Sequence, residues 1–237
     1  MRPLYYSFAL FVRQIWKDSM LITACMAAVL SAFFFRFGIP ALETALCAYL
    51  QKGAILLDYY LLFDLFLAFV TPYMFCFASA MMMLTEYDEN MANYLAVTPV
   101  GKMGYIVSRL VFPAIIAFLV SLGFLRLFSL TPWNFFMALS ACALTALMSI
   151  AVALLLFSYS HNRVEGMAMA KLSGLLLLGL MVPFFLSSNA QYLFSLLPSF
   201  WIAKYILEQD ALLLIPALVS TLIFLWALYR KFIRKIA

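Results

Sequence analysis

Charged residues are scarce in this 237-residue sequence. Only 11% of the residues are Asp, Glu, Lys or Arg, whereas 68% are hydrophobic. A soluble domain has about a quarter of its residues charged, so this chain has too few charges to build a water-soluble surface. The composition therefore excludes an ordinary soluble enzyme and favours a protein whose outside is covered by lipid.

Histidine and the usual metal-binding patterns are also lacking. His161 is the single histidine, and the four cysteines (Cys25, Cys47, Cys76 and Cys142) have no C-x-x-C spacing. The zinc-protease motif H-E-x-x-H and the phosphate loop G-x-x-x-x-G-K-[ST] are both absent from the sequence. We therefore expect no catalytic residue, no metal site and no cofactor in this chain. For His161, a surface role and a pH-sensing role both stay open.

Long apolar runs are what the sequence does contain. At about 20 residues per membrane-spanning helix, they predict an all-α polytopic membrane protein that forms one transmembrane domain over residues 1–237. We place the spans near residues 19–37, 61–85, 105–125, 134–157, 167–186 and 211–229.

The basic residues predict the orientation of these spans. An even number of spans puts both termini on one side, and with that side cytoplasmic the cytoplasmic face has 11 Lys and Arg residues against 4 outside. This bias follows the positive-inside rule and predicts a multi-pass protein of the bacterial cytoplasmic (inner) membrane with both termini in the cytoplasm. Membrane topology also explains the net charge of +5, so we expect the lipid bilayer, and no nucleic acid, as a partner.

The segment before the first span has a helical apolar stripe. Leu4, Phe8, Phe11, Val12 and Ile15 recur at steps of three and four residues. This spacing is typical of an amphipathic helix in the membrane interface. A plain extension of the first span is the alternative.

The connection between spans two and three gathers three acids: Glu86, Asp88 and Glu89. Helical spacing puts Met91 and Leu95 on one face beyond them, and Pro99 ends the helix because the residue before proline avoids helical geometry. These features predict a short amphipathic helix on the cytoplasmic side. Docking of a soluble partner and an ordinary connecting helix are both open interpretations.

This connection resembles the coupling-helix signature of ABC-2 type transporter permeases. That signature reads roughly E-x-E-x-G-T-x-x-x-L-L-x-T-P, with a Lys or Arg ten residues later at the start of span three. The residues in register with it are Glu86, Asp88, Leu95, Thr98, Pro99 and Arg109. Asn90 and Met91 stand where the signature has Gly and Thr, which puts the shape of the helix N-terminus in doubt.

The resemblance implies a function as well as a fold. It implies a permease subunit that exports a drug, peptide or other amphipathic compound. It also implies a P-loop ATPase as partner, which binds the ATP and Mg, and a second permease copy or a sibling permease. The residues that would couple to the ATPase are Glu86, Asp88, Glu89, Met91, Leu95, Thr98 and Pro99. A membrane assembly or scaffold protein without transport is the alternative.

Two further groups of charged residues are candidates. Arg163 and Glu165 lie in the connection between spans four and five, which resembles the same loop in some ABC-2 permeases, and this resemblance makes them further candidates for coupling to the ATPase. A solvated charged loop is the alternative. Near the outer surface, Asp64 can pair with Arg126 or Arg36 to form an outer gate. Interfacial anchoring of these side chains is the alternative.

Overall fold

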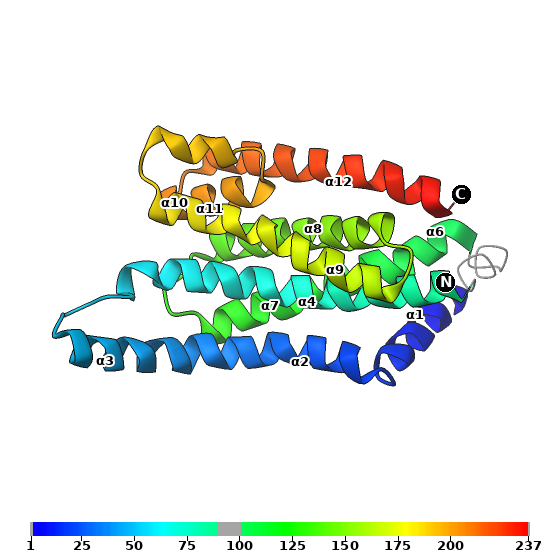
Figure 1. Cartoon of the computed structure of the whole chain (residues 1–237), viewed down its shortest axis with the longest axis horizontal. Coiled ribbons are helices and arrows are strands. Elements are labelled where there is room, and N and C mark those ends of the chain that lie inside the picture. The colour runs from blue at the N-terminus through cyan, green and yellow to red at the C-terminus, as the bar shows by residue number, and fades with distance from the viewer. Residues whose placement is uncertain (1, 90–100, 237) are drawn as a thin grey trace.

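The computed structural model describes the backbone of residues 2–89 and 101–236, which is helical and contains no strand in this part of the chain (Figure 1). Its α-helices are α1 (Arg2–Ile15), α2 (Ser19–Phe33), α3 (Ile39–Leu50), α4 (Tyr60–Asp88), α6 (Gly101–Ile106), α7 (Phe112–Phe128), α8 (Phe135–Tyr159), α9 (Arg163–Ser173), α10 (Leu178–Phe185), α11 (Pro198–Glu208) and α12 (Leu214–Ile236). Short 3-10 helices join several of them: η2 (Leu57–Tyr59), η4 (Gly174–Leu177), η5 (Asn189–Phe194) and η6 (Ala211–Leu213). Two π-helical turns, η1 (Phe34–Gly38) and η3 (Val107–Val111), lie between α2 and α3 and between α6 and α7.

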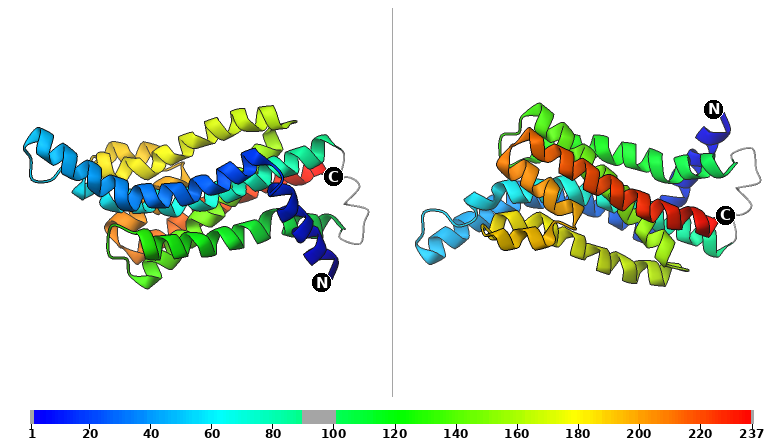
Figure 2. Two further views of the ribbon diagram at one scale, coloured as in Figure 1. Left: turned by 90° about the horizontal axis from the view of Figure 1, so that it is seen from below. Right: turned by 90° about the horizontal axis from the view of Figure 1, so that it is seen from above.

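Six of the continuous helical stretches in the described residues are long and apolar enough to cross a membrane. They begin and end at Ser19–Leu50, Leu57–Asp88, Met103–Phe128, Phe135–Tyr159, Arg163–Phe185 and Ala211–Lys235. The predicted all-α polytopic membrane fold is therefore confirmed. Both chain ends lie at the same end of the bundle (Figures 1 and 2). We refer to it as the terminal end and to the opposite one as the distal end.

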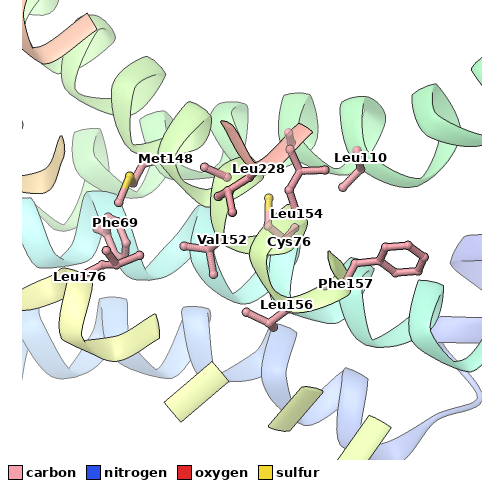
Figure 3. Close-up of a cluster of buried hydrophobic side chains, with 14 of the residues drawn as sticks. Phe69, Cys76, Leu110, Met148, Val152, Leu154, Leu156, Phe157, Leu176 and Leu228 are labelled. Carbon is pink, nitrogen blue, oxygen red and sulfur yellow. The ribbon is translucent and has the colours of Figure 1, made fainter. Parts of the chain in front are cut away.

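Helices α4 and α8 form the centre of the bundle. In their most apolar stretches 56% and 67% of the residues are buried, whereas only 17% are buried in the first and last spans. Figure 3 shows the core between them, where Phe69 and Cys76 of α4 meet Met148 and Val152 of α8. Alanines on the buried side of α8 allow close backbone approach, as is usual in membrane bundles. The sparsely buried first and last spans therefore lie at the outside of the bundle.

A proline in the middle of α4 creates a polar joint between three helices. Pro72 has no N–H to donate to the carbonyl of Ala68, one turn earlier. That carbonyl instead accepts hydrogen bonds from the hydroxyls of Ser121 in α7, at 2.9 Å, and Thr145 in α8, at 3.0 Å. Neighbouring hydroxyls thus satisfy a backbone group that has no water to bind inside a membrane.

The first span is longer than its apolar pattern predicts. The helix continues from α2 through η1 into α3 and ends at Leu50, not near residue 37. Pro40 stands in the first turn of α3, where a missing N–H is tolerated. At 1.5 Å per residue these 32 residues span about 48 Å, more than the roughly 30 Å of a hydrocarbon core. The end of α3 therefore extends past the rest of the bundle (Figure 1).

The amphipathic segment at the N-terminus is a separate helix, α1. It meets α2 at an angle at the terminal end (Figures 1 and 2), and the carboxylate of Asp18 caps α2 by accepting from the N–H groups of Met20 and Leu21. Phe11 is buried, and Phe8, Val12 and Ile15 pack against the core. Much of the predicted apolar stripe thus covers the bundle, while the opposite side exposes other apolar residues, such as Tyr5, Tyr6 and Leu10.

The chain returns at the distal end through the short helix α11, which packs against α8, α10 and α12. Contact with α10 is close because Gly179 has no side chain: a Cβ atom there would lie 2.9 Å from the backbone nitrogen of Phe200. The hydroxyl of Ser199 also donates to the carbonyl of Leu176, at 2.5 Å. Helix α11 therefore lies within the bundle, beside the spanning helices.

Candidate functional site

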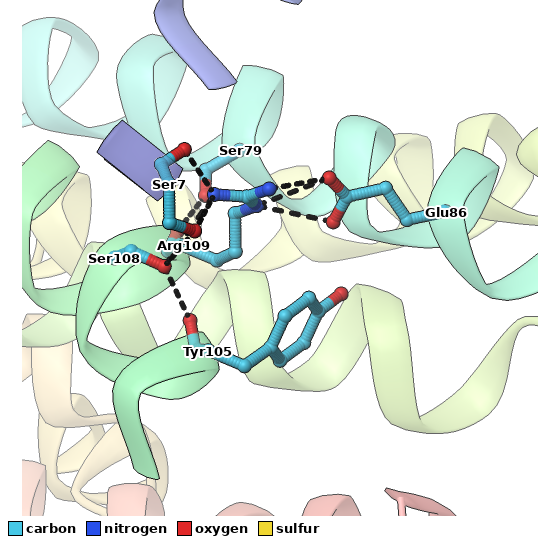
Figure 4. Close-up of polar contacts among 6 residues, drawn as sticks. All are labelled: Ser7, Ser79, Glu86, Tyr105, Ser108 and Arg109. Carbon is cyan, nitrogen blue, oxygen red and sulfur yellow. Dashed lines mark hydrogen bonds and ion pairs between the residues drawn. The ribbon is translucent and has the colours of Figure 1, made fainter. Parts of the chain in front are cut away.

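A buried ion pair joins the last turn of α4 to the π-helical turn η3 at the terminal end (Figure 4). Glu86 and Arg109 are 1% and 2% exposed. The Nη2 atom of Arg109 lies 2.7 Å from Oε1 of Glu86, and its Nε lies 3.1 Å from both carboxylate oxygens. A charge in such a place is costly unless it is paired, so each residue requires the other.

The remaining guanidinium nitrogen of Arg109 is bound to helix α1. Its Nη1 atom donates to the carbonyl oxygen of Ser7, at 2.9 Å, and to the Ser7 hydroxyl, at 3.2 Å. The guanidinium carbon also lies 4.8 Å from the ring centre of Phe11, a distance typical of a cation–π contact. Arg109 therefore links three elements that are far apart in the sequence: α1, α4 and η3.

The backbone of Arg109 is held as firmly as its side chain. Pro113 cannot donate to the Arg109 carbonyl, four residues earlier, and the helix opens into the π-turn at this point. The hydroxyl of Ser79 in α4 donates to that carbonyl instead (Figure 4). Ser79 and Glu86 are seven residues apart on one face of α4, so the two contacts fix both the position and the direction of Arg109.

The Glu86–Arg109 pair joins elements on both sides of the connection between spans two and three. Residues 90–100 connect α4 to α6, and the pair ties the last turn of α4 to η3, the turn that follows α6. Because α1 is bound to the same guanidinium, the ends of α1 and α4 and the turn η3 are held together at one side chain.

The residues predicted to couple to an ATPase fall into three groups. Glu86 points into the bundle, whereas Asp88 and Glu89 are exposed at its terminal end. Met91, Leu95, Thr98 and Pro99 lie outside the described residues, as does the predicted coupling helix. Glu86 therefore bonds to Arg109 inside the bundle, whereas Asp88 and Glu89 lie at its surface.

The second connection, between α8 and α9, uses its charges within the chain. Arg163 forms an ion pair with Asp18, at 2.7 Å, which also holds the pKa of that carboxyl below its ordinary value. Asn162 caps α9 by accepting from the N–H of Glu165, and the Glu165 carboxylate reaches back to the N–H of His161, at 2.7 Å. The arrangement resembles a capping box, with the N–H of His161 in place of that of the N-cap residue Asn162. Arg163 and Glu165 thus fasten α9 to the start of α2 and order its first turn.

The predicted outer pair of Asp64 and Arg126 is not formed in the described structure. Asp64 is fully buried near the distal start of α4 and accepts from Leu130 N, Thr131 N and Oγ1, and Trp133 Nε1 at 2.5–3.0 Å. Arg126 instead lies over the ring of Phe135, at 5.1 Å. Arg36 donates to the carbonyl of Ser129, at 2.7 Å. Asp64 therefore orders the loop between α7 and α8, because the donors to its carboxylate are backbone and side-chain groups of that loop and not a cation.

Comparison with known proteins gives one family for nearly the whole chain. Residues 11–230 match the model of the family described as fluoroquinolones export permease protein Rv2686c-like. The chain belongs to this family. It is 26% identical, over 94% of its length and 91% of theirs, to the fluoroquinolones export permease proteins Rv2686c and MT2760 of two Mycobacterium tuberculosis strains. No solved structure matches it. Membership of this permease family is consistent with the ABC-2 type resemblance of residues 86–109.

Several residues around Arg109 could not be predicted from the sequence. Ser7, Ser79, Tyr105 and Ser108 surround Arg109 (Figure 4), and none has a pattern that marks it among the many serines and tyrosines of the chain. Arg109 itself carried a signal: it is an arginine followed by a long apolar run, and an intramembrane charge calls for a partner. Glu86, the acid nearest the end of the preceding span, was the partner to look for.

Proposed function

We propose that this chain is the membrane-spanning subunit of an ATP-driven exporter, with the terminal end of the bundle in the cytoplasm. The family name supports export by a permease. The absence of a phosphate-loop motif from the sequence means that ATP hydrolysis has to come from another subunit. The single structural observation that carries the proposal is the buried Glu86–Arg109 pair at the base of the connection between spans two and three.

In this mechanism the ATPase pushes on residues 90–100 when it closes on ATP. Asp88 and Glu89 are exposed next to this segment and can pair with basic groups of the ATPase. Glu86 and Arg109 then carry the displacement into α4 and η3, and the bonds of Arg109 to Ser7 carry it into α1. The binding energy of the ATPase thereby changes the arrangement of whole helices, since their ends are tied by short, buried contacts.

The transported compound is proposed to be a fluoroquinolone or a similar amphipathic drug. The support comes from the printed names of the relatives, which are called fluoroquinolones export permeases. The export pathway is proposed to form between two permease units, either two copies of this chain or this chain and a sibling. The sparse burial of the first and last spans leaves apolar faces for such a second unit.

A purification experiment tests the coupling part of the proposal. The tagged chain is isolated in mild detergent from its own cells, and the proteins that accompany it are identified by mass spectrometry and assayed for ATP hydrolysis. We expect a P-loop ATPase in a fixed ratio, lost in Leu95→Asp but retained in Leu196→Asp. Leu196 is an 88% exposed leucine at the distal end and serves as the matched control. If the unaltered chain is purified without any ATPase, the result would favour the alternative of a membrane scaffold protein.

A transport measurement tests the substrate separately. Inside-out vesicles that contain the chain and its ATPase are expected to accumulate a fluorescent fluoroquinolone only when ATP is hydrolysed. Loss of uptake in Leu95→Asp, with normal amounts of the chain in the membrane, would connect transport to coupling. ATPase association without any fluoroquinolone uptake would retain the exporter and reject this substrate class.

A further inference from the structure

A basic cavity that is largely open to the outside lies at the terminal end of the bundle. It has a volume of about 770 Å³ and lies where the ends of α4, α8 and α12 meet. Basic side chains of α12 form one wall, and aromatic side chains form much of the rest. The residues of the described chain that line it are Tyr87, Ser158, Tyr159, His161, Trp226, Ala227, Arg230, Lys231, Arg234 and Lys235. None of these lining residues is acidic.

The spacing of the four cations creates repulsion that the described chain relieves only at Lys235, where the carboxylate of Glu165 is near enough to attract the ammonium group. Arg230 and Arg234, and likewise Lys231 and Lys235, are four residues apart on one helix, where like charges destabilise each other. The ion pairs present among the described residues involve Arg109, Arg163 and Lys204, and none involves a residue of α12. The helix dipole at the C-terminal end of α12 reduces the repulsion between these cations. It does not explain why an open cavity lies beside them.

One of the four cations has a structural role that the other three lack. The ammonium group of Lys235 donates to the carbonyls of Phe157 and Ser160 and thereby caps the end of α8. Arg230 and Lys231 instead rest on aromatic rings: Trp226 at 3.8 Å and Tyr159 at 3.2 Å. Arg230, Lys231 and Arg234 therefore keep their positive charge available to a ligand.

One residue that lines this cavity has a buried hydroxyl without a hydrogen-bond partner in the described structure. Ser158 lines it and is 8% exposed, yet its Oγ atom makes no hydrogen bond in the described structure. A buried polar group of this kind calls for a partner. Trp226 and Tyr159, each about half exposed, are the residue types that occupy the headgroup level of a bilayer.

We propose that this cavity binds the phosphate headgroup of an anionic phospholipid. A phosphodiester oxygen meets the guanidinium groups of Arg230 and Arg234 and the ammonium of Lys231, and the Ser158 hydroxyl donates to the same anion. Basic pockets between spanning helices are suited to such headgroups. The lipid relieves the repulsion along α12 and holds it against α8. The inference depends on the membrane position of the terminal end and not on the proposed ATPase or substrate.

Native mass spectrometry of the purified full-length chain tests this site. The protein is moved into detergent with equal amounts of phosphatidylglycerol and phosphatidylcholine, and the bound lipids are counted. We expect selective retention of phosphatidylglycerol and a drop of about tenfold in its affinity when Arg230→Gln and Arg234→Gln are combined, because each cation contributes to headgroup attraction. The pair Arg13→Gln and Lys17→Gln, exposed cations of the same end, should leave retention unchanged.

Two further arms separate the alternatives. Arg230→Lys with Arg234→Lys keeps the charge, so it should retain most of the binding even if the glutamine variant folds poorly. Inorganic phosphate at millimolar concentration should fail to displace the lipid. Displacement by phosphate, together with equal retention of the two lipids, would identify a free-anion site and overturn the lipid assignment. Phosphatidylglycerol retention that the glutamine pair does not change would place the lipid elsewhere.

Discussion

Helix α4 carries two buried carboxylates that are satisfied in opposite ways. Asp64, near its distal start, accepts bonds only from the short loop between α7 and α8. Glu86, near its terminal end, binds an arginine that is itself bound to a third helix. Asp64 therefore stabilises one turn of the chain, whereas Glu86 joins separate elements. A buried acid in a membrane bundle does not by itself indicate a moving part; the elements that its partners belong to decide that.

The largest effect is expected from removing one member of the Glu86–Arg109 pair. Arg109→Met leaves the Glu86 carboxylate buried without a cation and should lower the free energy of unfolding by about 3–5 kcal/mol. SDS-induced unfolding of the purified protein measures this. The double variant Glu86→Met, Arg109→Met should recover much of the loss, because no unpaired charge is left inside. A double variant as unstable as the sum of the single ones would show that the two residues act independently.

Asp64→Asn gives the matched test at the other end of the helix. The substitution removes the negative charge and one acceptor oxygen from a site with backbone and indole donors, so it should cost about 1–3 kcal/mol of stability. Association with the proposed ATPase should stay normal, since Asp64 contacts only the distal loop. Loss of the ATPase at unchanged protein levels would mean that the two ends are coupled and that the contrast drawn above is wrong.

A smaller effect is expected at two carbonyl groups, of Ala68 and Arg109, that have no helical N–H donor because a proline stands four residues later. The Arg109 carbonyl receives one hydroxyl, from Ser79, whereas the Ala68 carbonyl receives two, from Ser121 and Thr145, within the described structure. Ser79→Ala should therefore cost about 1 kcal/mol, and Ser121→Ala about half of that, because a second donor remains. The same unfolding assay applies. Equal losses of stability in the two variants would show that Thr145 does not compensate for the missing Ser121 hydroxyl at the Ala68 carbonyl.

The smallest effect is expected at the partly exposed Asp18–Arg163 pair. Asp18→Asn should cost less than about 1 kcal/mol, since solvent screens the two charges. The Arg163 guanidinium lowers the pKa of the Asp18 carboxyl, so folding favours the charged form. The stabilisation is therefore present above the ordinary pKa of aspartate and is lost as the pH falls below about 4. A difference in stability between Asp18→Asn and the unaltered protein that persists at lower pH would contradict this.

Composition and apolar patterning were enough to predict the helical membrane fold, the number of spans and the N-terminal helix. The long apolar runs located six spans, and the spacing of Phe8, Phe11, Val12 and Ile15 predicted the N-terminal helix. The motif from Glu86 to Arg109 led to the permease family. Each of these signals is local, because a helix satisfies its own backbone and shows its buried side through its own periodicity. The extension of the first span to Leu50 was missed, because Arg36 and Pro40 resemble the end of a helix.

Only the tertiary structure decided how the polar residues pair. The sequence offered Arg126 and Arg36 to Asp64, and the fold gave it the N–H groups of residues 130 and 131. The sequence placed Glu86 on a docking segment, and the fold turned it toward Arg109 and, through that residue, toward Ser7. A hydrogen bond depends on two atoms being brought within about 3 Å, and the packing of helices distant in sequence determines which atoms meet. The apolar pattern fixes where helices lie in a membrane, while close packing in three dimensions selects the partner of each buried charge.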